Sequence, residues 1–364
     1  MARKASNFAT KDFISNMPDN VVTHILDRLP VQDAVKTSSL SKNWRLKWTM
    51  LTQLVFDDNF VDYLTKTDGE SKFGRIISRI FLNLKSAITK FVLYIDERNN
   101  SALDDEDIVH WIMLLSKKGV EDLTIMKTFG EPLTLPFHLF SCLELKHLKL
   151  FYCFFDPPAS FHGFPRLLSL EGVLDFESSK FGEFITQCPL LEILNIDIFE
   201  LVGFLPKLQE LNLDFASCKL TKDVAKTKFP ATFPCLKTLE LSTIDVYKGG
   251  LLSFALELIG SSPNLQTLEI SANELNYDPT RAKLSPDVDY STTGLLQLRS
   301  VVVLGFKDSV IEVCLIESLL ACSPFLKTFV VRPHSHLSSN EQLRFARKLL
   351  KLHRASLVVE IDLL

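Results

Sequence analysis

A short pattern of apolar positions recurs along most of this chain of 364 residues. Its clearest copies read CPLLEILNI, LPKLQELNL, FPCLKTLEL, SPNLQTLEI and SPFLKTFVV, each with an apolar anchor followed three and five residues later by further apolar residues. The alternating end of each copy predicts a short β-strand, and the anchor is expected to pack beneath it. The anchors are Leu51, Ile88, Val120, Leu145, Leu167, Leu191, Leu208, Leu236, Leu265, Leu298 and Leu326.

Segments of helical periodicity lie between these strands. Residues 71–87 place apolar side chains on one helix face, and residues 104–119 have an acidic start, two lysines at the end and Gly119 at the C′ position. The acidic run can also be interpreted as a metal site. We favour the helix start, because the charge complements the macrodipole and no second ligand cluster follows.

Helices in the repeat region are predicted to end at ITQCP, IGSSP and LLACSP, where Pro turns the chain into the next strand. Each repeat is therefore a helix, a turn and a strand. The spacing of the anchors is typical of leucine-rich repeats of irregular length, and stacking such units gives a curved solenoid. The fold class is thus an α/β solenoid, with the repeats as an irregular leucine-rich-repeat horseshoe.

Both ends of the chain differ from the repeats. Residues 341–354 predict a basic amphipathic helix, capped near Ser339 or Asn340 and followed by a strand, which would cover the open edge of the last repeat. The preceding His334 and His336 are expected to be plain surface residues. Pro18 and Pro30 delimit a first helix in residues 13–48, with Pro18 placed in its first turn.

The stretch 13–48 predicts three short helices, with Asp33 at an N-cap-like place in the second and with Trp44 and Trp48 four residues apart on the third. So few residues cannot bury much core alone. The first helix is apolar over more than one stripe, with Val21 and Val22 beside Ile25 and Leu26. This surplus of apolar surface favours a protein partner.

Composition narrows the function classes. The net charge is −4 and 46% of residues are hydrophobic, so no basic field points to nucleic acid or to an anionic membrane. No apolar run is long enough to span a membrane, and the start lacks a secretory apolar run, so we expect a cytoplasmic or nuclear protein. The sequon at Asn99 is then a chance match.

Catalytic and metal signatures are missing from the sequence. Seven cysteines show no C-x-x-C and no zinc spacing, which predicts reduced, buried thiols and no metal. No phosphate loop, dinucleotide fingerprint, nucleophile elbow or zinc-protease motif occurs. We therefore expect no enzyme and no cofactor.

The stretch MPDNVVTHILDRLPVQDAVKTSSLSKNWR resembles an F-box, with a Met-Pro start, an Ile-Leu pair, a Leu-Pro end of the first helix and a closing Trp-Arg. Met17 replaces the commoner Leu, a near-isosteric change. The whole layout, with RASLVVEI near its end, resembles the plant F-box/leucine-rich-repeat proteins of the FBD group. The expected division is a flexible start at 1–11, an F-box at 12–50, repeats at 51–331 and an FBD-like cap at 332–364.

This resemblance implies the substrate-recognition subunit of a cullin-type (SCF) ubiquitin ligase. The F-box would bind an SKP-type adaptor and, through it, a cullin, while the repeats would hold an unknown protein target for ubiquitination. Basic residues Lys36, Lys42, Arg45 and Lys47 would face the adaptor or only solvent, whereas Trp48 is expected in the core. The residues placed at or supporting the adaptor contact are Met17, Pro18, Val21, Ile25, Leu26, Leu29, Pro30, Leu40 and Trp44.

The expected target site is the strand face of the solenoid, because solenoids bind through their curved surface. Its candidate residues are Glu192, Asn195, Gln209, Asn212, Lys237, Glu240, Gln266 and Glu269, with plain solvated surface as the alternative for each. Two other functions remain open at this point. One is a receptor that needs a small molecule or an inositol phosphate, and the other is a repeat scaffold outside the ligase.

Overall fold

A computed structural model describes the chain at residues 17–67, 73–95, 103, 105–175, 183–197, 205–216, 233–247, 249–273 and 295–364. The chain forms two compact units, Met1–Leu145 and Lys146–Leu364. The boundary between them falls inside the predicted repeat region, so the predicted divisions at 12–50, 51–331 and 332–364 stay predictions. The sequon at Asn99 lies outside the described residues.

The first unit begins with helices α1 (Asp19–Leu26) and α2 (Val31–Lys36). Pro18 and Pro30 are the N-caps of these helices. Pro18 therefore lies one position before the first turn of α1, whereas the sequence predicts it within that turn. A proline suits this place because its missing N–H would have no intrahelical partner. Asp33 therefore lies within α2 and is not its cap. A 3-10 helix, Thr37–Ser39, directly follows α2, and the predicted third helix is replaced by a turn and the 3-10 helix Lys47–Met50.

The rest of the first unit stacks helices on parallel strands. The strands are β1 (Gln53–Phe56), β2 (Lys90–Ile95) and β3 (Asp122–Lys127), each parallel to the next. The helices are α3 (Asp58–Thr67), α4 (Phe73–Asn83) and α5 (Asp105–Ser116), followed by the short strand β4 (Leu133–Thr134) and the 3-10 helix Phe137–Ser141. Gly119 follows α5 with φ 73°, the left-handed conformation that the predicted C′ glycine requires.

The second unit also consists of parallel strands, each bonded to the next along the chain. Its strands are β5 (His147–Phe154), β6 (Ser169–Asp175), β7 (Ile193–Asp197), β8 (Glu210–Asp214), β9 (Thr238–Ile244), β10 (Thr267–Ala272), β11 (Ser300–Phe306), β12 (Thr328–Pro333) and β13 (Glu360–Leu363). Parallel neighbours need a crossover through a turn or a helix, as the repeat pattern predicts.

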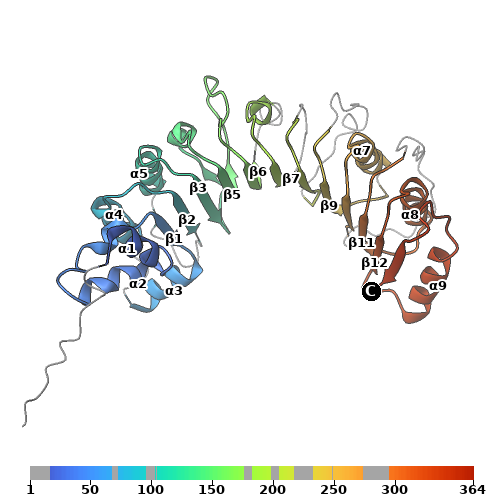
Figure 1. Cartoon of the computed structure of the whole chain (residues 1–364), viewed down its shortest axis with the longest axis horizontal. Coiled ribbons are helices and arrows are strands. Elements are labelled where there is room, and N and C mark those ends of the chain that lie inside the picture. The colour runs from blue at the N-terminus through green and yellow to red at the C-terminus, as the bar shows by residue number, and fades with distance from the viewer. Residues whose placement is uncertain are drawn as a thin grey trace, which may run out of the picture. The chain divides into compact units, whose positions relative to one another are not determined.

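Helices cover one face of this sheet. The second unit contains α7 (Gly249–Gly260), α8 (Val310–Cys322) and α9 (Ser339–Leu349). In Figure 1 the strands β6, β7, β9, β11 and β12 lie along one side of the unit, and α7 and α8 lie along the other. The α/β repeat architecture is therefore confirmed, whereas the horseshoe curvature stays a prediction.

The apolar anchors set where the strands begin. All eleven predicted anchors are at most 2% exposed, and each is followed two residues later by the first residue of a strand, as in Leu51 before β1 and Leu326 before β12. A buried anchor fixes the chain beneath the sheet, and the alternating residues after it then pair with the previous strand. The anchor prediction is confirmed along the whole repeat region.

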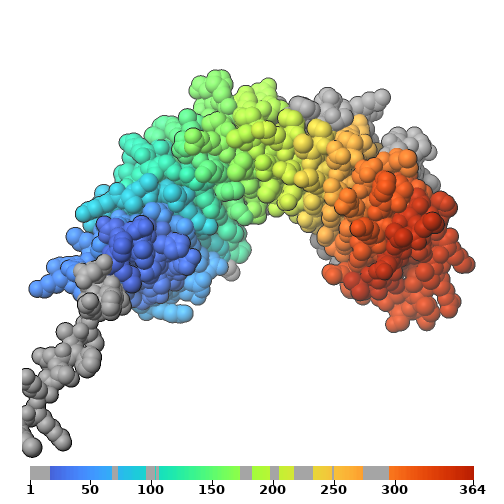
Figure 2. Space-filling view, viewed as in Figure 1, coloured from blue at the N-terminus to red at the C-terminus, as the bar shows by residue number. Residues whose placement is uncertain are grey.

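The C-terminal part adds α9 and β13 to the last repeat and forms the red surface of Figure 2. Ser338 is the N-cap of α9 and forms a capping box with Glu341, so the predicted cap at Ser339 or Asn340 is one or two positions too late. The outer face is less polar than expected of a cap, because Leu343 and Leu350 of this region are exposed. His334 is buried, so the prediction of a surface role is wrong for this residue.

Candidate functional site

Helix α1 carries two apolar stripes with different surroundings. Val22 and Leu26 are buried in the first unit, whereas Val21 and Ile25 are 40% and 37% exposed. Residues four apart lie on one side of a helix, so each pair forms its own stripe. The buried stripe anchors the helix, which leaves the other stripe available to a partner.

Further exposed apolar side chains belong to the same small module. Leu29 and Leu40 are both exposed, and so is Leu46, which the sequence prediction omitted. Leu46 comes just before a 3-10 helix, where no apolar periodicity marks it. Together with Val21 and Ile25 these residues are called here the α1 surface.

One carboxylate fastens α1 to the first repeat. Asp27, just after α1, accepts hydrogen bonds from the Thr52 backbone N–H at 2.9 Å, the Thr52 hydroxyl at 2.6 Å and the Gln53 backbone N–H at 3.2 Å. Gln53 is the first residue of β1. Charge-assisted bonds to backbone donors are short and strong, so this contact fixes the direction in which α1 leaves the repeat.

The nine residues predicted at or supporting the adaptor contact differ in burial. Leu26 and Trp44 are buried, so both support the module and neither reaches a partner. Trp48, expected in the core, is only half-buried. Met17 is half-buried, and the remaining predicted residues are exposed, namely Pro18, Val21, Ile25, Leu29, Pro30 and Leu40.

The four basic residues near this surface also differ in their contacts. Lys36 forms an ion pair with Asp33 at 3.0 Å and lies 4.5 Å from the centre of the Tyr63 ring, and its hydrogen bond to Asp33 raises its pKa. Lys47 bonds to Asp19 within the module. Lys42 and Arg45 are exposed. Lys36 and Lys47 are thus paired within the module, and an adaptor contact of any of the four basic residues stays a prediction.

The predicted target residues form two rows in the second unit. Asn195, Asn212, Glu240 and Glu269 are direct neighbours in register on β7 to β10. The leucine or isoleucine residues on either side of each of them are buried, so these four side chains lie on the sheet face opposite the core.

The other four predicted target residues come just before the strands. Backbone hydrogen bonds join them in order, from Gln209 N–H to Glu192 at 2.8 Å, Lys237 N–H to Gln209 at 2.9 Å and Gln266 N–H to Lys237 at 2.9 Å. The Lys237 ammonium also donates to the Gln209 amide oxygen at 3.1 Å. This row lies along the edge where the strands begin, apart from the first row.

Glu269 has an unusual electrostatic environment within the first row. Partial burial raises the pKa of its carboxyl, the neighbouring Glu240 raises it further, and Arg332 acts in the opposite direction. Like charges directly opposite one another on paired strands are unfavourable, so a cation on this face would relieve the repulsion.

The described cysteines differ in burial. Burial raises the pKa of the Cys142 thiol to about 12 and that of Cys188 to about 11, which keeps both protonated. Cys235 is exposed, so the prediction of buried thiols is wrong for it. Among the residues that the structure describes, no cluster of His, Cys, Asp and Glu suits a metal ion, and no helix has the length and apolar character to cross a membrane.

A helical module with an exposed apolar stripe, joined to stacked strand–helix repeats, defines a repeat protein with a separate helical module. Residues 14–54 match the F-box domain family, and residues 108–203 match the family described as FBD-associated F-box protein At5g56370, LRR repeats. The Arabidopsis thaliana F-box/FBD/LRR-repeat protein At1g13570 is 30% identical over 88% of this chain and 91% of its own length. The chain therefore belongs to the F-box/FBD/LRR-repeat family.

Two further relatives from Arabidopsis thaliana agree with this assignment. The FBD-associated F-box protein At4g10400 is 31% identical over 57% of this chain, and the F-box/LRR-repeat protein At4g14103 is 30% identical over 52%. The chain spans about half of each of these two relatives, 52% and 50% of their lengths. Neither matched family is an enzyme family, and the F-box implies an SKP-type adaptor as partner.

Proposed function

We propose that this chain is the substrate-recognition subunit of a cullin-type ubiquitin ligase. The observation that carries the proposal is the α1 surface, which includes the exposed apolar stripe at Val21 and Ile25. It belongs to a module that matches the F-box family. An exposed stripe on a helix anchored by its opposite side fits a groove on a partner. The adaptor docks there, and the cullin is reached through it.

The target docks on the outward strand face of the second unit. Asn195, Asn212, Glu240 and Glu269 offer amides and carboxylates in one row, spaced by the separation of neighbouring strands. Such a row suits an extended or helical segment of a protein better than a phosphate group, because its charged members are acidic. Lys237, which comes before β9, lies in the other row at the strand starts.

The inositol-phosphate alternative has less support for a related reason. Arg299 and Lys327 come just before β11 and β12, so with Lys237 they follow the strand starts in a line and do not converge on one point. A polyanion site needs several cations directed at the same group. We place the protein in the cytoplasm or the nucleus, where the ligase acts.

The test is adaptor binding by the full chain. The double variant Val21→Asp/Ile25→Asp should weaken adaptor affinity about 100-fold, because two apolar contacts at the centre of the interface become charged. Affinity is measured by calorimetry or by co-purification from a co-expression culture. Leu82→Asp on α4 is the matched control, since Leu82 is 76% exposed and lies outside the module.

The proposal fails if the wild-type chain forms no complex with any SKP-type adaptor. It also fails if the double variant binds as well as the wild type. Thermal unfolding of each variant accompanies the binding measurement, and exposed substitutions of this kind change stability by less than about 0.5 kcal/mol. A loss of binding with an unchanged melting temperature is therefore a loss of the interface.

A further inference from the structure

The basic helix α9 divides its cations between two sides. At about 100° per residue, Arg344 and Lys348 lie one turn apart on one side, and Leu343, Arg347 and Leu350 lie on a neighbouring side. Leu350 follows the last residue of α9 with helical dihedrals, so the same geometry extends to it. The opposite side, with Phe345 and Leu349, is buried.

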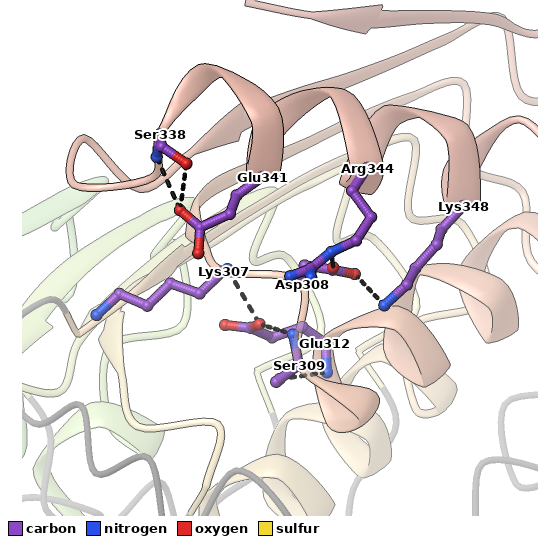
Figure 3. Close-up of polar contacts among 8 residues, drawn as sticks. All are labelled: Lys307, Asp308, Ser309, Glu312, Ser338, Glu341, Arg344 and Lys348. Carbon is purple, nitrogen blue, oxygen red and sulfur yellow. Dashed lines mark hydrogen bonds and ion pairs between the residues drawn. The ribbon is translucent and has the colours of Figure 1, made fainter.

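The first of these sides is occupied within the protein. Asp308, just before α8, lies 3.3 Å from the Arg344 Nε and 2.7 Å from the Lys348 Nζ, and its own side chain is only 2% exposed. Figure 3 shows both cations reaching from α9 toward Asp308, with the capping box of Ser338 and Glu341 at the start of the helix. These contacts hold α9 in one orientation, so its remaining side is presented rigidly.

The second side is open to a partner. Leu343 and Leu350 are 51% and 67% exposed. Arg347 lies on the same side of α9 as these leucines, and Lys351 directly follows Leu350 in the chain. Both are exposed, and neither side chain has an ion pair or hydrogen bond within the part of the chain that the structure describes. Residues Leu343, Arg347, Leu350 and Lys351 are called here the α9 surface.

We propose that the α9 surface binds an acidic amphipathic helix of a partner protein. The two leucines are seven residues apart, about two turns or 10 Å, which is the spacing at which side chains of one helix pack against another. Arg347 and Lys351 supply the positive rim, so the partner helix carries aliphatic residues on one side with Asp or Glu beside them. This site shares no residue with the predicted adaptor and target sites.

Charge also excludes a second copy of this chain as the occupant. Two α9 surfaces face to face would bring Arg347 and Lys351 of one copy against the same cations of the other. A lipid surface is disfavoured for another reason. Interfacial helices bind through a broad apolar side, and α9 turns Phe345 and Leu349 into the protein, which leaves two leucines for the bilayer.

The experiment uses the full chain and a fluorescent synthetic helical peptide. The probe carries leucines at seven-residue spacing with glutamates beside them, and a second probe carries lysines in place of the glutamates. Fluorescence anisotropy should show binding of the glutamate probe that is at least tenfold tighter than that of the lysine probe. The variant Arg347→Glu/Lys351→Glu should reverse this preference, and Leu343→Ser/Leu350→Ser should weaken binding at least tenfold.

Controls separate the surface from general charge and from the adaptor site. Lys327→Glu and Leu82→Ser change an exposed lysine and an exposed leucine elsewhere, and both should leave probe binding unchanged. The variant Val21→Asp/Ile25→Asp should bind the probe normally, so failure of the ligase proposal and failure of this one are distinguishable. Vesicles of phosphatidylcholine with phosphatidylserine test the lipid alternative.

Three results would overturn the proposal. The first is equal binding of the two probes by the wild type. The second is no loss of binding on charge reversal or on removal of the two leucines, in variants whose melting temperatures match the wild type. The third is vesicle binding that exceeds glutamate-probe binding and depends on the same residues, which would assign the surface to anionic lipid.

Discussion

Near each end of the chain one aspartate joins a helical element to the neighbouring repeat, but the two contacts differ in kind. At the F-box, Asp27 belongs to the module and accepts from backbone N–H groups of Thr52 and Gln53. At the C-terminal part, Asp308 belongs to the repeat and binds the side chains of Arg344 and Lys348. Backbone donors are fixed in space, whereas long cationic side chains move and are screened by salt.

The difference indicates what each attachment is suited to do. The hydrogen bonds of Asp27 to backbone donors fix the direction of α1 relative to β1, whatever the ionic strength. The ion pair between α9 and Asp308 holds a helix whose exposed side is also charged. Salt should therefore weaken both this ion pair and charge-driven binding at the α9 surface. The four predictions below test this comparison, beginning with the largest effect.

Substitutions in the two stripes of α1 should differ most. Leu26→Ala should destabilise the first unit by about 2–5 kcal/mol, because it leaves a cavity in a fully buried position. Val21→Ala should change stability by less than about 0.5 kcal/mol and weaken adaptor binding instead. Urea unfolding with adaptor titration measures both. Equal destabilisation by the two variants would contradict the division of α1 into a buried and an exposed stripe.

Removal of the F-box attachment should have the next largest effect. Asp27→Ala leaves the N–H groups of Thr52 and Gln53 without their acceptor, and we expect a loss of about 1–3 kcal/mol. Asp27→Asn, the matched variant, retains an acceptor oxygen and should lose less. Unfolding in low and high salt should give the same difference between Asp27→Ala and wild type. A strong salt dependence would contradict an attachment through backbone donors.

The corresponding change at α9 should be smaller and salt-dependent. Asp308→Asn removes the charge facing Arg344 and Lys348, and asparagine tolerates the φ of 71° found at this position. Because both cations are well exposed, the expected cost is about 1 kcal/mol or less. Hydrogen exchange of the α9 amides should be faster in the variant than in the wild type at low salt. At about 0.5 M salt the ion pairs of the wild type are screened, so the two exchange rates should converge.

The smallest expected effect concerns the capping box of α9. The Ser338 hydroxyl and then its backbone N–H hold the pKa of the Glu341 carboxyl below its usual range. A carboxyl with a lowered folded-state pKa stabilises the fold at higher pH and loses this contribution as pH falls through that value. Protection of the α9 amides should therefore decline below about pH 4 in the wild type. Ser338→Ala should show less of this decline, and an identical acid profile would contradict the assignment.

The repeats were predictable from sequence because their information is local. An anchor such as Leu191 or Leu265 and the alternating residues after it determine burial and strand direction within a few positions. The α1 stripes were predictable for the same reason, since Val21, Val22, Ile25 and Leu26 show helical spacing.

The remaining features depend on contacts between distant positions or on irregular backbone. The spacing of Trp44 and Trp48 predicts one α-helix, but a turn and a 3-10 helix occupy this stretch, so Trp44 is the buried residue and Leu46 is exposed. The attachments of Asp27 and Asp308 join residues 25 and 36 positions apart, and nothing in the local pattern marks them. Such pairs follow from packing and not from periodicity.

Each buried anchor lies two positions before the first residue of its strand. This constant spacing has a consequence for how the sequences of related chains diverge. Each repeat sets its own register at its anchor, so residues gained or lost between repeats need not disturb the strands on either side. One residue gained between Leu236 and β9, in contrast, would turn Glu240 inward and a core leucine outward. Related chains can therefore differ widely in length between repeats, whereas the two-residue step should tolerate no change.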